Sequence, residues 1–390
     1  MLRVALITRR FWPLVGGKER VMATLADELR QSGAKPVVLT AQWDSHWPVE
    51  IDHSGTPVVR LPQPQIRGWG TIRYLWSLSR WLKSHRHELD AVVVSSLNYD
   101  AYAAVVALAG TTIPVILRAE TTGPTGDSQW QREMQFGSRI KSRCQQAAAI
   151  VASTDDIAAE LRAAEYRADR IQCIPNGVIV SEPRTADRRL AARAILGEAN
   201  PDMKVSADTP VGLYIGRLAA TKGLHDLVRA WRRIVNIWPE ARLWLVGEGP
   251  DRDDLYDRLR DHELKYHVVM PGAFDDVAEL LHAADVFVLP SHEEGTMVSL
   301  LEAMAAGLPL VASDLPAHER LASHRERALL SPIKNPIVLA ESIAEVLTLC
   351  EEAAVRADRA RNHIVDHHSA KMMTQRHLEL IHQLIRHKHE

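Results

Sequence analysis

Cysteine is scarce in this sequence. The 390 residues contain only three cysteines, Cys144, Cys173 and Cys350, which lie far apart and lack the spacing of metal ligands. Disulfide-rich scaffolds and zinc sites depend on recurrent, closely spaced cysteines, so the pattern disfavours both. It is typical of a protein that works in a reducing compartment, and we expect a cytoplasmic location.

Long apolar segments are also missing. The N-terminus, MLRVALITRRFW, lacks the apolar stretch of a signal peptide. The longest uncharged segment, residues 101–117, contains Gly110 and Pro114, which predict a helix, a turn and a strand rather than a membrane span. With 46% hydrophobic and 25% charged residues, the composition is that of a soluble globular protein. The length predicts two domains.

Acidic residues are absent from one basic, aromatic segment. Residues 67–87, RGWGTIRYLWSLSRWLKSHRH, contain five Lys or Arg residues and no Asp or Glu. If 71–86 is helical, one face presents cations around a tryptophan: Arg73, Trp76, Arg80 and Lys83. Such a face suits an anionic membrane surface or a stacked sugar acceptor, and an ordinary solvated helix explains it equally well. No nucleic-acid-binding motif accompanies it, so we expect no nucleic-acid partner.

Short apolar runs alternate with helical patterns along most of the chain. In the first half, strands are expected at 2–8, 35–40, 90–96, 113–119, 148–153 and 170–175. In the second half, they are expected at 210–216, 241–247, 267–272, 285–291 and 308–314. Continuous apolar strands separated by helices predict parallel sheets that are covered on both faces.

These patterns predict an α/β protein with two doubly wound, Rossmann-like domains that face each other across a cleft. We expect an N-terminal domain over residues 1–180 and a C-terminal domain over 210–365. The polar, strandless segment 181–209 suits a linker. Residues 366–390 are expected to form a C-terminal helix that packs back toward the N-terminal domain.

Two glutamates lie in the segment PSHEEGTMVSLLEAMAAG, at the carboxyl end of the strand expected at 285–291. A helix is expected from Met297 to Ala306, with Thr296 as its N-cap. Glu294 precedes this helix and Glu302 lies within it, among apolar and small residues. A carboxylate with little surrounding water needs hydrogen-bond donors. An ion pair or cap would supply them, and so would the hydroxyls of a sugar or ribose.

This segment resembles the signature of family 4 of the retaining glycosyltransferases, in which two glutamates are separated by seven residues. The resemblance implies two Rossmann-like domains of the GT-B type. It also implies that Glu294 contacts the donor sugar and that Glu302 holds the ribose hydroxyls of the nucleotide. The backbone between them would meet the donor diphosphate, at Gly295, Thr296, Met297 and Val298.

Two further segments fit the same family. YIGRLAATKGL places Arg217 and Lys222 at a strand-to-helix turn, where they resemble the cations that stabilise the leaving diphosphate. RRFWPLVGGKER places Gly16 and Gly17 at the start of a helix, like the N-domain loop that closes over the diphosphate. This is not a G-x-G-x-x-G pattern, so no nicotinamide cofactor is expected. The Asp-x-Asp pattern at 251–253 is better explained as a helix N-cap, and we expect no metal.

The sequence departs from the family at two places. Many relatives have a His after the fourth strand of the N-domain, where it contacts the transferred sugar. Here the segment is LRAETTGPTGD, with Arg118 and Glu120 as the residues that could replace it. The segment after Glu319 also lacks the usual glycine-bearing loop.

The resemblance implies transfer of a sugar from a nucleotide sugar to an acceptor hydroxyl with retained anomeric configuration, in polysaccharide, glycolipid or other glycoconjugate biosynthesis. The N-domain would bind the acceptor, which is a sugar, a lipid-linked compound or another hydroxyl compound. The C-domain would bind the donor. Two alternatives remain: a sugar-nucleotide epimerase of the same architecture, and a non-catalytic partner subunit that binds the nucleotide sugar. A peripheral position on the inner face of the membrane is also expected.

Overall fold

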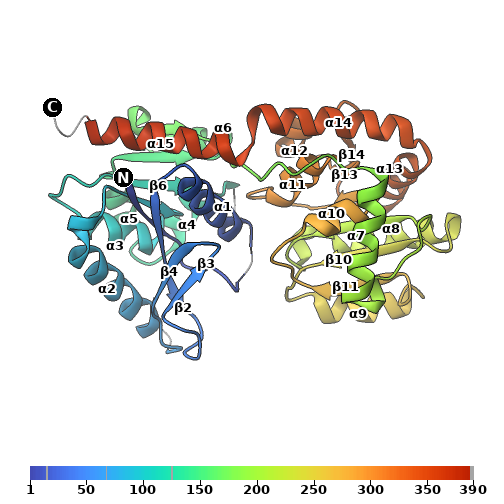
Figure 1. Cartoon of the computed structure of the whole chain (residues 1–390), viewed down its shortest axis with the longest axis horizontal. Helices are drawn as coiled ribbons and strands as arrows, with labels where there is room; N and C mark the ends of the chain where they lie inside the picture. Colours follow the sequence, from blue (N-terminus) through green and yellow to red (C-terminus); the bar gives the residue numbers. More distant parts are fainter. Residues whose placement is uncertain (15, 67, 124–125, 387–390) are drawn as a thin grey trace. The chain divides into compact units, whose positions relative to one another are not determined.

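The computed structural model describes residues 1–14, 16–66, 68–123 and 126–386. The chain forms two compact units (Figure 1). Unit 1 comprises Met1–Gly177 and the C-terminal residues from Ala370, and unit 2 comprises Val178–Ser369. Each unit contains a largely parallel sheet with helices, which confirms the predicted α/β class with two Rossmann-like domains.

The sheet of unit 1 has eight strands in the order β3-β4-β2-β1-β5-β6-β7-β8. The strands are β1 (Arg3–Ile7), β2 (Lys35–Gln42), β3 (Glu50–His53), β4 (Thr56–Pro62), β5 (Ala91–Ser95), β6 (Val115–Ala119), β7 (Ala149–Ala152) and β8 (Ile171–Cys173). The helices are α1 (Gly17–Gln31), α2 (Trp69–Ser84), α3 (Tyr99–Ala107), α4 (Asp127–Glu133), α5 (Gly137–Cys144), α6 (Asp155–Ala163) and α15 (Ala370–Arg386). Every residue of β5, β6 and β7 is buried, as expected for strands covered on both faces.

β3 and β4 form an antiparallel hairpin that the sequence patterns did not predict. The hairpin turns at Gly55, which has φ +81°. β3 lies at the edge of the sheet and is half-buried at best, so it lacks the continuous apolar run that marks the inner strands.

The sheet of unit 2 has six parallel strands in the order β11-β10-β9-β12-β13-β14. The strands are β9 (Val211–Ile215), β10 (Arg242–Val246), β11 (Val268–Gly272), β12 (Val286–Leu289), β13 (Leu310–Ser313) and β14 (Leu329–Ser331). The α-helices are α7 (Ala186–Ala199), α8 (Leu224–Ile237), α9 (Arg252–Asp261), α10 (Ala278–Ala283), α11 (Val298–Ala306), α12 (Pro316–Ala322), α13 (Pro336–Thr348) and α14 (Cys350–His367).

Each sheet has a topological switch point, where ligands bind in open α/β sheets. In unit 2 the chain builds outward from β9 to β11 and then returns to place β12 on the other side of β9. In unit 1 the corresponding pair is β1 and β5. The loops that follow these four strands are therefore the first places to look for ligand-binding residues.

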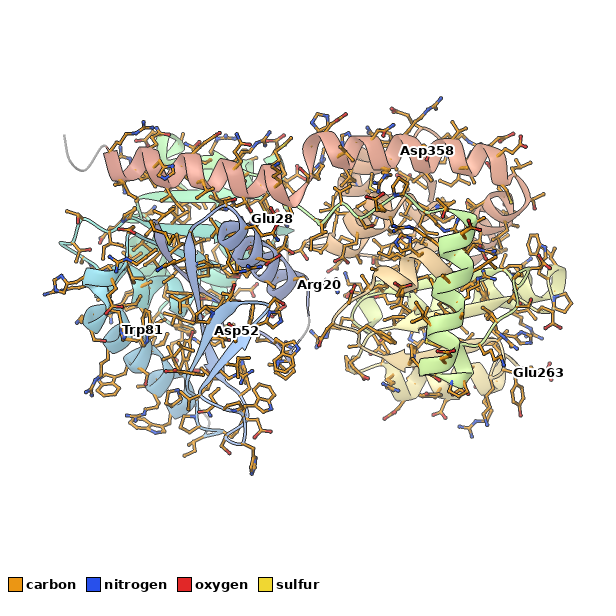
Figure 2. All side chains as sticks on the ribbon, in the orientation of Figure 1. Arg20, Glu28, Asp52, Trp81, Glu263 and Asp358 are labelled. Carbon is orange, nitrogen blue, oxygen red and sulfur yellow. The ribbon has the colours of Figure 1, made fainter. Side chains whose placement is uncertain are left out.

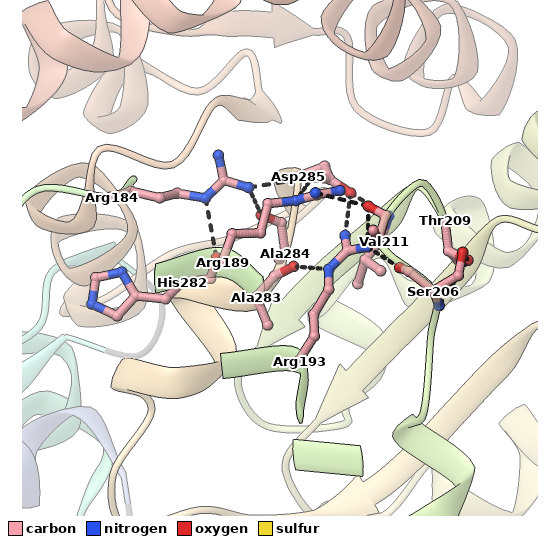
Figure 3. A network of polar contacts seen from close by, with 11 residues as sticks. Arg184, Arg189, Arg193, Ser206, Thr209, Val211, His282, Ala283, Ala284 and Asp285 are labelled. Atoms are coloured by element: carbon pink, nitrogen blue, oxygen red, sulfur yellow. Dashed lines mark hydrogen bonds and ion pairs between the residues drawn. The ribbon is translucent and has the colours of Figure 1, made fainter. Parts of the chain in front are cut away.

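The segment 181–209 is a structured part of unit 2, and its interpretation as a linker is corrected. It contains α7, which packs against α10. Figure 3 shows three arginines from this segment converging on Asp285, the residue before β12. The nitrogen-to-oxygen distances are 3.2 Å from Arg184, 2.7 Å from Arg189 and 2.8 Å from Arg193. Polar pairing rather than a long apolar run attaches this segment, which is why its composition resembled that of a linker.

The chain passes between the units at two neighbouring positions. In unit 2, Val178 forms a parallel bridge with Ser369. In unit 1, the N–H of Gly177 lies 3.2 Å from the sulfur of Met373, on α15. α15 packs against α1 and so belongs to the N-terminal unit. Among the helices of the described ranges, none has the length and apolar character needed to span a bilayer.

Candidate active site

The loops after β9 and β12 are bound together at the switch point of unit 2. The backbone N–H of His292 donates to the carbonyl oxygen of Thr221 at 2.8 Å, and its imidazole Nε2 lies 2.8 Å from Asp226 Oδ2. Gly223 adopts φ +64°, and a Cβ at this position would lie 2.0 Å from the carbonyl oxygen of Pro290. Only glycine permits this approach, so the two loops form one joined surface.

This joined surface brings Lys222 and Glu294 together. Lys222 Nζ lies 2.9 Å from Glu294 Oε2, with 21% and 7% of the two side chains exposed. The buried Ser291 hydroxyl donates a hydrogen bond to the other carboxylate oxygen, Oε1. Both oxygens of Glu294 are therefore held, and the carboxylate has a defined orientation before any ligand binds.

Arg217 lies on the same loop as Lys222, and its side chain is exposed. The buried Tyr214 hydroxyl donates to the carbonyl oxygen of Arg217 at 2.9 Å, which orients this part of the loop. Burial, and secondly the Glu294 charge, raise the pKa of Tyr214 well above its ordinary value, so the phenol stays a donor. Arg217 forms no ion pair with any residue that the structure describes, so its guanidinium is available to an anion.

The loop after β10 supports the Arg217 loop from its other side. The N–H of Leu218 donates to Glu248 at 3.0 Å, and the N–H of Asp251 donates to Leu218 at 3.1 Å, in both cases to the carbonyl oxygen. Asp251 occupies the predicted N-cap position of α9, although its side chain makes no capping hydrogen bond there. No cluster of three residues suited to a metal occurs within the described ranges.

The N-terminus of α11 differs from the prediction. The N-cap residue is Met297, with φ +48° in the left-handed region, and not Thr296. The left-handed turn moves the Thr296 hydroxyl away from the capping position, and no side chain caps the described end of this helix. The first N–H groups of α11 therefore lack a side-chain cap, and uncapped helix N-termini are places where anions bind. Strained backbone of this kind often accompanies a binding site.

Glu302 lies about one helical turn after the start of α11, roughly 5–6 Å along the axis. Its side chain is half-buried, between the buried residues Leu301 and Ala303. It is thus less enclosed than the sequence pattern suggested. Its expected role in holding ribose hydroxyls remains a prediction.

His318, on α12, is a neighbour of this site that sequence reasoning missed. It is fully buried, and its Nδ1 lies 2.7 Å from the carbonyl oxygen of Ser313. Burial lowers the pKa of His318, while the carboxylate of Glu294 acts in the opposite direction. A neutral imidazole therefore lies close enough to sense the charge of Glu294. No family motif marks this position, so only the packing of α12 reveals it.

The switch point of unit 1 carries a second group of polar side chains. Lys18 Nζ donates to the Ser96 hydroxyl at 2.8 Å, and Ser96 itself has φ +69°. Gly16 is the N-cap residue of α1 and Gly17 its first residue, at the helix start where they were expected. A Cβ on Gly16 would lie within 2.3 Å of a Glu19 carboxylate oxygen, so the carboxylate folds closely over this glycine. Burial raises the pKa of Glu19.

Arg118 and Glu120 occupy a fully buried network, so the expectation that they face the acceptor or sugar is corrected. Arg118 donates to Glu120 Oε1 at 3.0 Å and to Asn176 Oδ1 at 2.7 Å, and its third contact is His377 Nε2 at 2.6 Å. Burial, and secondly the Arg118 charge, lower the pKa of His377 to about 3. The neutral imidazole thus accepts from Arg118, and the network ties β6 to α15. Both residues have 0% exposure, so neither side chain is accessible at the surface of unit 1.

The helix expected at 71–86 is α2, which spans Trp69–Ser84. Its cationic and aromatic residues are exposed as the pattern predicted: Arg73, Trp76, Arg80 and Lys83. The opposite side of the helix is buried in the core of unit 1.

Comparison with known proteins gives family matches in both units. Residues 209–349 match the family described as Glycosyl transferases group 1, and residues 16–177 match the Glycosyl transferase 4-like domain. The chain is 34% identical to glycogen synthase of Mycobacterium tuberculosis (strain H37Rv) over 154 residues, which cover 39% of this chain and 37% of that protein. It is 25% identical over 84% of both chains to LpsD of Rhizobium meliloti, a lipopolysaccharide core biosynthesis glycosyltransferase.

The fold is similar to that of sucrose-phosphate synthase from Thermosynechococcus elongatus. The TM-score is 0.82, with 21% sequence identity, over 99% of this chain and 100% of that structure. The match with glycogen synthase, in contrast, spans little more than a third of the relative. The two family matches together cover most of both units, and the chain belongs to the glycosyltransferases of group 1, with the two-domain GT-B fold.

Proposed function

We propose that this protein is a retaining glycosyltransferase that moves a sugar from a nucleotide-sugar donor to an acceptor hydroxyl. The observation that carries the proposal is the pairing of Lys222 with Glu294 at the switch point of unit 2. It places a cation and an oriented carboxylate beside the exposed guanidinium of Arg217 and the uncapped start of α11. Cations suit a diphosphate and a carboxylate suits sugar hydroxyls, so the site has groups for both parts of a nucleotide sugar.

In the proposed reaction, the bond between the sugar and the diphosphate breaks and negative charge develops on the leaving group. Arg217, Lys222 and the N–H groups of residues 295–298 stabilise that charge. Glu294 accepts hydrogen bonds from the donor sugar, and Glu302 holds the ribose hydroxyls. Gly16 and Gly17 are proposed to contact the diphosphate from unit 1.

We propose that no metal is required, because two side-chain cations are available for the diphosphate. Transfer activity should then be unchanged after treatment with a chelator. Activity that is lost with the chelator and restored by a divalent cation would contradict this part of the proposal.

The acceptor is proposed to bind unit 1 and the donor unit 2. The relatives named above act in glycogen and lipopolysaccharide synthesis. An acceptor from a polysaccharide, glycolipid or other glycoconjugate pathway is therefore proposed for this chain. A cytoplasmic location is proposed as well, because the three cysteines are free thiols.

The first experiment is a thermal-shift panel of nucleoside diphosphates and nucleotide sugars, which identifies the donor. The identified donor is then incubated with candidate acceptors, and the anomeric configuration of the product is read by NMR. Retention supports the proposal, and inversion contradicts it. Formation of an epimer without acceptor would favour an epimerase, and nucleotide binding without turnover on any acceptor would favour a non-catalytic subunit.

A further inference from the structure

One side of α2 exposes an unusual combination of apolar and cationic side chains. We define its basic aromatic face as six residues: Trp69, Ile72, Arg73, Trp76, Arg80 and Lys83. The three apolar members are 52%, 58% and 51% exposed, in chain order. Exposed apolar side chains of this size in close succession are uncommon in monomeric proteins and mark interaction surfaces.

The tryptophan at the centre of this face is flanked by two arginines. The guanidinium carbons of Arg73 and Arg80 lie 5.1 Å and 5.4 Å from the centroid of the Trp76 ring. Neither arginine, nor Lys83, pairs with a carboxylate in the part of the chain that the structure describes. The sequence contains no acidic residue between Asp52 and Glu88. The face therefore carries unbalanced positive charge around an aromatic centre.

The rest of α2 is fixed, so this face cannot rotate into the core. Tyr74, Leu78 and Leu82 on the opposite side are fully buried. Trp81, labelled in Figure 2, lies between the two sides; it is half-buried and stacks on His85 with 4.1 Å between ring centroids. A helix anchored in this way presents its outer face permanently.

The start of α2 lies at the ligand-binding edge of unit 1. α2 follows the carboxyl end of β4, and Gln63, in the intervening loop, accepts a hydrogen bond of 3.0 Å from Arg9. Arg9 follows the carboxyl end of β1, one of the two strands at the switch point. The first half of the basic aromatic face is thus near the loops where unit 1 would bind its ligand.

We propose that the basic aromatic face of α2 docks on an anionic lipid bilayer. Tryptophan favours the boundary between headgroups and acyl chains, and arginines beside it reach lipid phosphates. A neutral sugar would use the aromatic ring but has no need of three unpaired cations. Docking would also bring the acceptor edge of unit 1 close to the bilayer. We therefore infer an acceptor that is carried on a lipid, and this part rests on the proposed function.

The test is cosedimentation of the full chain with vesicles of phosphatidylcholine, with and without about one third phosphatidylglycerol. We expect binding only to the anionic vesicles, and weaker binding as salt increases. The variant R73Q/W76S should bind roughly tenfold more weakly or worse, because it loses one surface cation and the apolar anchor. All the substituted side chains are exposed, so thermal unfolding should be unchanged.

A matched control exists elsewhere on unit 1. Phe136 is 56% exposed and has Arg139 stacked on it at 5.7 Å. The variant F136S/R139Q loses the same kinds of group and should bind anionic vesicles like the unaltered protein. Equal loss in both variants would overturn the proposal, as would equal binding to neutral vesicles or no vesicle binding at all.

The vesicle assay needs neither donor nor acceptor, so its outcome is separable from the proposed function. Vesicle binding without transfer activity would support the docking surface and count against the transferase. Transfer to a soluble acceptor without vesicle binding would support the transferase and count against the docking surface. If W76S weakens binding of a soluble oligosaccharide and vesicles do not bind, the face is a sugar platform and the lipid proposal is wrong.

Discussion

Lys222 Nζ lies 2.9 Å from Glu294 Oε2, although the two residues come from the loops that follow different strands, β9 and β12. Each group balances the charge of the other in a partly buried site, and the Ser291 hydroxyl fixes the second carboxylate oxygen. We propose that the donor enters beside this pair, with its diphosphate toward Lys222 and its sugar toward Glu294. The pair would then hold both groups in place before the reaction, which lowers the cost of ordering them.

The first prediction concerns the cation. Lys222→Met should lower kcat/KM for transfer by about 10²–10³-fold, because one stabilising contact to the leaving diphosphate is lost. The control Arg229→Gln removes an exposed cation from α8, close in sequence but away from this loop, and should keep near-full activity. A loss of less than about threefold in Lys222→Met would show that this cation has no role in the reaction.

The second prediction separates the two glutamates. Glu294→Ala should abolish measurable transfer while the nucleoside diphosphate still binds, because the sugar alone loses its contact. Glu302→Gln should instead weaken nucleoside diphosphate binding by about tenfold, since a charged acceptor of ribose hydroxyls becomes neutral. Calorimetric titration with the nucleoside diphosphate and a transfer assay measure the two effects. Identical profiles in the two variants would contradict the division of roles.

The third prediction tests the close approach at Gly223. Gly223→Ala should destabilise unit 2 by more than about 2 kcal/mol and weaken donor binding, because the new Cβ would meet the Pro290 carbonyl oxygen at 2.0 Å. Gly307 provides the control: its φ is also positive, at +70°, but the nearest atom to an added Cβ is Arg361 Cδ at 3.7 Å. Gly307→Ala should cost only about 1 kcal/mol and retain donor binding. Thermal unfolding, measured with and without nucleotide, compares the two variants. Equal effects would mean that the close approach of Gly223 to Pro290 is unimportant.

The fourth prediction follows from His377. Its pKa is about 3 in the folded protein, against an ordinary value of 6.5. The unfolded chain therefore binds a proton that the folded chain excludes as the pH falls below about 6.5. As the pH falls from about 6.5 toward 3, protonation of this group in the unfolded chain should lower the free energy of unfolding by up to about 1.4 kcal/mol per pH unit.

His377→Gln isolates this contribution, since glutamine can still accept from Arg118 but does not titrate. Its denaturation midpoint should change less between pH 7 and pH 5 than that of the unaltered protein. His46→Gln is the matched control, because its side chain is 92% exposed. A pH dependence that stays the same in His377→Gln would exclude the buried imidazole as its source.

Much of the fold could be predicted from local pattern alone. The eleven expected strands match β1, β2 and β5 to β13, because their apolar runs are continuous and their flanking turns are marked by glycine, proline or polar residues. β14 was missed, since Leu329–Ser331 is too short to stand out. β3 was missed because an edge strand needs no continuous apolar run, and β4 because Pro57 and Arg60 interrupt its apolar residues.

The candidate site, like the fold, could be predicted only in part from the sequence. The resemblance to the glycosyltransferase family drew attention to Arg217, Lys222 and Glu294, and all three follow strands whose carboxyl ends share one edge of the sheet. The left-handed conformation of Met297 and the burial of His318 could not be predicted, since both depend on how α11 and α12 pack. Arg118 shows the limit most clearly: it was a candidate contact for the transferred sugar, yet Asn176 and His377 enclose it from distant parts of the chain.

By itself, the sequence determined the order of strands and helices, the division into two α/β units and the family. These properties depend on hydrophobic periodicity and on short motifs, which are local along the chain. Tertiary structure decided which polar groups are paired and which are exposed: Lys222 with Glu294, Arg118 with His377, and Trp76 in solvent. Pairing and burial depend on distances between residues far apart in sequence, and only the folded chain sets those distances.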